Sequence, residues 1–125
     1  MDSYNIITHS ETFHVDEVVG CAMLKYLRPV KIWRMRDQQF IDSVGGYIIL
    51  DVGKVYDPSP PPTKSVRLDH HQSSFSLTYD SNSKIPLSSC GLVWLHYGQQ
   101  IVRKFVTERS LNLDTEDQKN IVRKF

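Results

Sequence analysis

The fold is decided by one short stretch, Tyr47-Ile48-Ile49-Leu50-Asp51, in which a run of apolar residues ends at a carboxylate. This is the most apolar run of the chain, and we interpret it as a strand. In an open parallel sheet, the groups at the carboxyl ends of the strands face one shared crevice. The stretch therefore predicts a functional site beside Asp51.

Two other apolar runs, residues 4–8 and 65–68, also read as strands, and each is followed by histidines and carboxylates. The residues that follow them are His9, His14, Asp16, Asp69, His70 and His71. Because strand ends that are far apart in sequence can meet at one edge of a parallel sheet, we expect these side chains and Asp51 to converge.

A mixture of imidazoles and carboxylates suits Mn²⁺, Mg²⁺, Fe²⁺ or Zn²⁺. A carboxylate between two such clusters is the usual bridge of a two-metal site, which is the place that Asp51 would take. Each histidine alone has a structural interpretation, and a lone Asp-His-His in a surface loop is more often solvated than liganded. The joint placement at three strand ends favours the metal interpretation.

The rest of the chain alternates between helical and extended patterns. Apolar residues at helical spacing predict a helix over residues 16–27 that ends before Pro29. The remaining expected elements are a strand at 30–34, a short helix or turn at 37–43, a helix at 91–105 and a final helix capped by Asp114. This alternation predicts an α/β fold, a mostly parallel sheet with helices on both faces, in one domain over residues 1–125.

Aromatic residues and loops carry several further expectations. Trp94 and Tyr97 are expected to pack from the 91–105 helix against the sheet, and His96 to be a surface or packing residue. The proline-rich residues 57–62 predict a stiff extended connector, with a ligand for a partner domain as the alternative. The polar residues 73–86 predict a mobile loop after the Asp-His-His motif.

Composition limits the partners and the compartment. The net charge of +1 gives no bulk attraction to nucleic acid, so any polyanion must be bound by local groups. Cys21 and Cys90 lack metal-type spacing and are typical of reduced core thiols in an intracellular protein. We expect no signal peptide, transit peptide or membrane partner, because the first residues match neither leader type and no apolar stretch reaches membrane-spanning length.

Four segments carry a resemblance to a known family: residues 8–17, 51–58, 69–75 and 87–98. They resemble the melanocyte-proliferating-gene family of DHH-like proteins, formerly described as metal-dependent protein hydrolases. The resemblance implies the amino-terminal domain of a DHH phosphoesterase, a 3'-5' RNA exonuclease of the cytoplasm, nucleus or mitochondrion. The family usually has glycine where this chain has Glu11 and Lys54, and its members are more than twice as long.

Roles for individual residues follow from the same resemblance. It implies a first metal held by His9, His14 and Asp51, and a second held by Asp16, the bridging Asp51 and His70. Asp69 would orient the imidazoles beside the metals, and His71 would face the scissile phosphate, so that Asp51 and His71 are the catalytic residues. An imidazole at His14 where the wider superfamily has a carboxylate favours Mn²⁺, Fe²⁺ or Zn²⁺ over Mg²⁺, with Mn²⁺ preferred.

Two functions of different classes remain open from the sequence. The first is a metal-dependent phosphodiesterase or exonuclease that acts on RNA or nucleotides through two metals. The alternative is a non-catalytic fragment that binds a metal or a partner, because one later carboxylate and a carboxyl-terminal domain expected from the resemblance are missing. A peptidase has no HExxH helix to support it, and Ser88, Ser89 and Cys90 have no neighbouring histidine and acid to make them nucleophiles.

Overall fold

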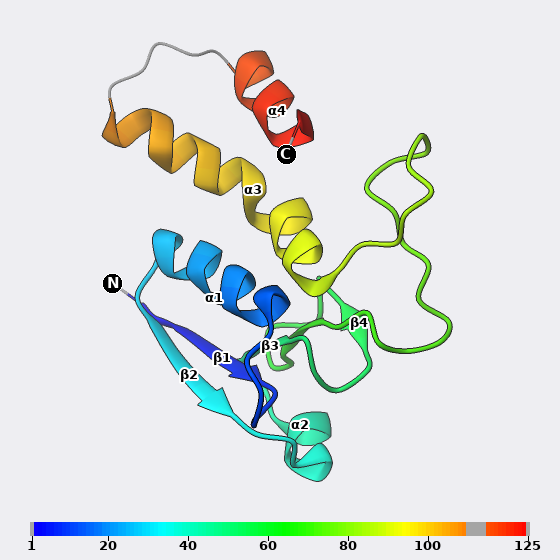
Figure 1. Cartoon of the computed structure of the whole chain (residues 1–125). Coiled ribbons are helices and arrows are strands. Elements are labelled where there is room, and N and C mark those ends of the chain that lie inside the picture. The colour runs from blue at the N-terminus through cyan, green and yellow to red at the C-terminus, as the bar shows by residue number, and fades with distance from the viewer. Residues whose placement is uncertain (1, 110–114, 125) are drawn as a thin grey trace.

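One five-stranded sheet forms the centre of the computed structural model, which describes residues 2–109 and 115–124 (Figure 1). The strand order is β2-β1-β3-β5-β4. The strands are β1 (Tyr4–Thr8), β2 (Val30–Arg34), β3 (Ile48–Leu50), β4 (Tyr56–Asp57) and β5 (Val66–Leu68). All neighbouring strands are parallel except the β4 and β5 pair, so the predicted mostly parallel sheet is confirmed.

The register of the sheet brings three strand ends to the same edge. Ile7 of β1 pairs with Ile49 of β3, and Leu50 of β3 pairs with Leu68 of β5. The residues that follow these strands therefore leave the sheet side by side, as expected for the carboxyl ends of parallel strands.

Helices cover both faces of the sheet, as predicted. The helices are α1 (Val15–Leu27), α2 (Gln38–Ser43), α3 (Ser89–Glu108) and α4 (Thr115–Lys124). Figure 1 shows α1 and α3 on one side of the sheet, α2 on the other, and α4 beside α3. None of the helices in the described part of the chain is long and apolar enough to cross a bilayer.

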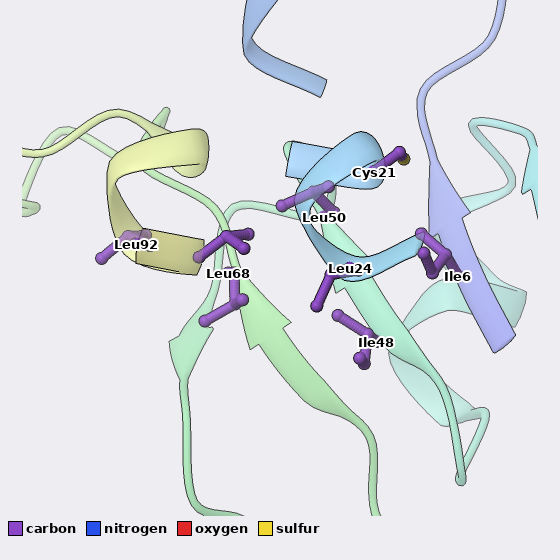
Figure 2. Packing of buried hydrophobic residues seen from close by; sticks show 8 residues of the cluster. Ile6, Cys21, Leu24, Ile48, Leu50, Leu68 and Leu92 are labelled. Carbon is purple, nitrogen blue, oxygen red and sulfur yellow. The ribbon is translucent and has the colours of Figure 1, made fainter. Parts of the chain in front are cut away.

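The main core lies between the sheet and the pair α1 and α3 (Figure 2). Its buried residues are Ile6, Cys21, Leu24, Ile48, Leu50, Leu68, Leu92 and Val93. Helix α1 approaches β3 closely at Gly20, where an added Cβ would come within 2.8 Å of the Leu50 Cδ2 atom. Burial raises the pKa of the Cys21 thiol to about 11, in line with the inert core thiol that the sequence predicts.

A second, smaller core joins α2 to the opposite face. Ile41 of α2 packs with Ile7, Ile49 and Val52, all of them buried. Asp37 caps this helix, because its carboxylate accepts a hydrogen bond of 3.2 Å from the backbone N–H of Phe40.

Three expectations concern Trp94, Tyr97 and Asp114 in the later part of the chain, and the first of them needs correction. Trp94 does not pack on the sheet. Successive residues of a helix are rotated by roughly 100° about its axis, so Trp94 lies on a different face of α3 from Leu92 and Val93. It instead packs against α4, and its Nε1–H donates to the Val122 carbonyl oxygen at 2.7 Å. Tyr97 does reach the sheet, where its ring meets Tyr4 edge-on. The Asp114 cap lies outside the described residues.

The two loop regions lack helices and strands, while the stiffness of the first and the mobility of the second stay predictions. The proline-rich segment contains no helix or strand from residue 58 to residue 65. Residues 69–88 also contain none, and a turn forms at Asp80, whose carboxylate accepts from the backbone N–H groups of Asn82 and Ser83. Strand β4, which ends just before the prolines, was not predicted.

Candidate metal centre

The polar residues that follow β1, β3 and β5 meet at one edge of the sheet. His9, Asp51 and Asp69 come directly after these strands and are almost fully buried, with 2%, 3% and 1% of their surface exposed. Helix α1 adds side chains from its first turn, because its amino terminus begins at the same edge. The convergence expected from the strand ends is therefore present.

One group of possible metal ligands contains His9, His14, Glu17 and Asp51, whose ligand atoms lie within 4.8 Å of one another. The His9 Nε2 atom is 3.2 Å from Asp51 Oδ2 and 3.3 Å from Glu17 Oε2. This nitrogen is buried, yet it has no hydrogen-bond partner. A buried nitrogen without a hydrogen-bond partner, with two carboxylate oxygens close to it, fits the donor set of a divalent cation.

Glu17 was missed as a site residue. The sequence places it in the first turn of a helix, where a glutamate has an ordinary capping role. In the structure its two carboxylate oxygens accept the backbone N–H of His14 at 2.9 and 2.8 Å, and the residue is only 2% exposed. The spacing of His14 and Glu17 could have identified Glu17 in advance. A glutamate three residues after the residue that caps a helix points back toward the backbone of that capping residue, which here is His14.

A second group contains Asp51, Asp69, His70 and His71, again with ligand atoms within 4.8 Å of one another. The Asp51 Oδ1 atom is 3.3 Å from His70 Nε2 and 3.6 Å from His71 Nδ1. Asp51 is thus common to both groups, with Oδ2 on the His9 side and Oδ1 on the side of His70 and His71.

Asp16 joins the second group through His70, whose Nε2 atom is 3.0 Å from Asp16 Oδ2. The same carboxylate accepts the backbone N–H groups of Ser89 at 3.1 Å and Cys90 at 2.5 Å, at the start of α3. Negative charge at a helix amino terminus is favourable, so these bonds hold Asp16 in place.

Asp69 binds the backbone on both sides of the site. Its Oδ2 atom accepts the Lys54 backbone N–H at 2.7 Å, and its Oδ1 atom accepts the His70 backbone N–H at 2.8 Å. Oδ1 also lies 2.6 Å from His71 Nδ1. Asp69 is therefore arranged to orient the His71 imidazole.

Asp51 is held in a strained and unfavourable setting. Its backbone has a φ of 59°, in the left-handed region that costs a non-glycine residue on the order of 1 to 3 kcal/mol. The Ser89 hydroxyl donates to Asp51 Oδ1 at 3.2 Å. Burial raises the pKa of the Asp51 carboxyl, and the neighbouring Asp16 raises it further. An anion that is buried beside another anion is stabilised when a cation binds between them.

The site opens into a cavity of about 350 Å³. Its walls include His9, His14, Asp51, Asp69 and His71, so ligands of both groups face the same space. The His71 side chain is 50% exposed and lies at the solvent side, whereas the Asp51 side chain is 2% exposed and lies at the back. The cluster is therefore reached from solvent on the side of His71.

Comparisons with known proteins agree with the resemblance of the four motif segments. The model of a family described as "Uncharacterised protein family (UPF0160)" and labelled MYG1_exonuc matches residues 5–125. The "MYG1 protein" of Dictyostelium discoideum is 39% identical over 120 residues, which cover 94% of this chain and 32% of the relative. The "MYG1 exonuclease" of Homo sapiens is 39% identical over 107 residues, which cover 79% of this chain and 27% of the relative.

The chain spans about a third of the length of the curated relatives that it matches. No solved structure matches it. The family model covers nearly every residue, including all members of the two ligand groups. The chain belongs to the MYG1 family, UPF0160.

Proposed function

We propose that this chain is a metal-dependent phosphodiesterase domain of the DHH phosphoesterase type, an exonuclease that acts on RNA or nucleotides through two metals. One observation carries the proposal: Asp51 belongs to both groups of possible ligands and turns a different oxygen to each. A carboxylate placed in this way is what a two-metal site requires as its bridge.

The proposed ligands follow the two groups. The first cation would be held by His9, His14 and Asp51, with Glu17 as a further oxygen donor, and the second by Asp16, Asp51 and His70. Bound divalent cations would supply Lewis acidity to a phosphoryl oxygen and to a water molecule. Manganese is the proposed metal, because a site of mixed imidazole and carboxylate ligands tolerates it well.

His71 is proposed to contact the phosphate. Its Nδ1 atom is engaged by Asp69 Oδ1 at 2.6 Å, so Nε2 would be the ring nitrogen that contacts a phosphate oxygen. Its exposed position beside the cavity leaves room for that contact. Asp51 at the back and His71 at the entrance would hold the phosphodiester between them.

The names of several relatives support the reaction class. Relatives from Homo sapiens and Bos taurus are called exonucleases, and each matches this chain over 79% of its length. RNA as the substrate, 3'-5' polarity and an intracellular location are proposals for the whole protein. We also propose that its relatives' additional length supplies a further ligand and a surface that clamps the nucleic acid.

A non-catalytic role is the second candidate, and the geometry of Asp16 favours it. Both oxygens of this carboxylate accept hydrogen bonds from the start of α3, so the second group is less free to bind a cation than the first. We expect these 125 residues to bind at least one divalent cation but to cleave RNA slowly, on the order of a thousandfold below a site with both metals in place.

Degradation of an end-labelled RNA oligonucleotide in the presence of Mn²⁺ tests the proposal. Slow, Mn²⁺-dependent release of nucleotides that disappears in Asp51→Asn is the expected result. Asp57→Asn is the matched control, because Asp57 is an exposed aspartate on β4 away from both groups. Binding of Mn²⁺ without any Asp51-dependent cleavage would select the non-catalytic role, and the absence of Mn²⁺ binding would refute both.

A further inference from the structure

We infer that the groove beside the metal cavity, formed by Val55, Tyr56, Phe75 and Leu77, is a binding site for a nucleoside, and that Lys54 holds the phosphate attached to it. This inference rests on the proposed function in one respect, because the phosphate is expected in the adjacent metal cavity. The groove itself has its own lining and its own test.

The groove has the size and composition of a small-ligand site. Its volume is about 550 Å³, and four of the eight residues that line it are apolar or aromatic: Val55, Tyr56, Phe75 and Leu77. The rings of Tyr56 and Phe75 meet at 80° with their centroids 5.7 Å apart, and Val55 is 41% exposed. Tyr56 is held in position by a contact of 2.6 Å between its hydroxyl and His96 Nε2. An aromatic surface that is held in place in this way is suited to stacking against a base.

Polar groups at one side of the groove can read the edge of a base. The Gln72 Oε1 atom is buried and has no hydrogen-bond partner. Ser74 and Ser76 line the groove on the same segment of chain. The Gln72 amide and the Ser74 and Ser76 hydroxyls could bond to the edge of a base, after a rotation that brings Gln72 Oε1 out of its buried position.

Lys54 connects the groove to the metal cavity, because it lines both. Its backbone N–H is bound to Asp69, and its side chain is exposed. Among residues 2–109 and 115–124, no carboxylate forms an ion pair with its ammonium group. A cation in this position beside a carboxylate-rich cluster is available for a phosphate.

The continuity of the chain supports a single ligand across both spaces. Gln72 of the groove directly follows His71 of the cavity, and Val55 directly follows Lys54. The two segments are joined by a hydrogen bond of 3.2 Å from the Asp69 N–H to the Val55 carbonyl oxygen. A nucleotide with its phosphate at Lys54 and its base between Val55 and Phe75 would occupy the two spaces together.

Titration of the isotope-labelled chain with adenosine 5'-monophosphate, followed by NMR in EDTA, tests the inference. We expect saturable shifts of the backbone amides at residues 54–56 and 72–77, and at least about tenfold weaker binding of ribose 5-phosphate, which lacks the base. We also expect Lys54→Gln to weaken binding of the nucleotide about tenfold, as loss of a charge-assisted contact does. Lys64→Gln is the matched control, because Lys64 is an exposed lysine that lines neither space.

The results separate this inference from the proposed function, because no metal or hydrolysis is needed. Equal affinity for the nucleotide and for ribose 5-phosphate, shifts outside the groove, or an unchanged affinity in Lys54→Gln would overturn the nucleoside site. Any of these results together with Mn²⁺-dependent cleavage would leave the proposed function standing. Binding in the groove without metal-dependent cleavage would refute the proposed function alone.

Discussion

Replacement of Asp51 by asparagine should change the stability of this chain in opposite directions with and without metal. In the absence of metal, Asp51 is a buried anion whose pKa is raised by burial and by Asp16. The folded state then holds the proton of this carboxyl at a pH where the unfolded state has lost it, so stability falls as pH rises above about 3.8. We therefore expect Asp51→Asn to be more stable than the wild type in EDTA at pH 7, with the difference vanishing toward pH 3.8.

Saturating metal should reverse the order of the two proteins. At a Mn²⁺ concentration of about 100 times Kd, binding to one site stabilises the folded state by about 2.7 kcal/mol. An unfolding entropy of roughly 2.1 cal/mol/K per residue gives roughly 0.26 kcal/mol/K for 125 residues, so the wild-type Tm should rise by about 10 °C. Asp51→Asn removes an oxygen anion that both groups share, and most of that rise should disappear.

Differential scanning calorimetry at pH 7, with EDTA and with Mn²⁺, measures both effects on the same samples. The exposed Asp57→Asn should behave as the wild type in each condition. The reasoning is refuted if Asp51→Asn gains the same Tm increase from Mn²⁺ as the wild type. It is also refuted if the variant is less stable than the wild type in EDTA at pH 7.

Three further predictions concern stability. Glu11→Gly should raise the free energy of unfolding by about 1 kcal/mol in urea denaturation, because Glu11 has a φ of 75°; an unchanged midpoint would contradict this. Gly45→Ala should lower the free energy of unfolding by roughly 1 to 3 kcal/mol in the same assay, because the alanine Cβ would clash with the Thr63 carbonyl oxygen. An unchanged free energy would show that the backbone at Thr63 moves to make room. Trp94→Phe removes the hydrogen bond to the Val122 carbonyl oxygen and should therefore increase the rate of amide hydrogen exchange in α4. Equal protection of α4 in the variant and the wild type would disprove this.

The strands that carry the site were predictable because each apolar run has a clear end. The polar residue His9 closes β1, and Pro29 separates α1 from β2, so both strands were placed at their observed bounds. The convergence of His9, Asp51 and His70 followed from one rule about parallel sheets and not from any property of the individual residues.

Other features depend on contacts that no local pattern records. Strand β4 has only two residues, too few for any alternation, and it exists because it pairs with β5. Ser89 holds Asp51 across 38 positions of sequence, which a local search for an adjacent histidine and acid could not find. Trp94 packs against α4 instead of the sheet. The spacing of apolar residues predicts which face of a helix is buried, but not which element covers that face.

With Asp16 as a metal ligand, as proposed, the start of α3 would be coupled to the metal centre in a thermodynamic sense. The backbone N–H groups of Ser89 and Cys90 orient this carboxylate toward His70, and they do so only while the first turn of the helix is formed. Fraying of that turn would release Asp16, so cation binding and helix formation share one equilibrium. By linkage, a cation at Asp16 would change the stability of the first turn of this twenty-residue helix by the same factor by which the formed turn changes the affinity for the cation.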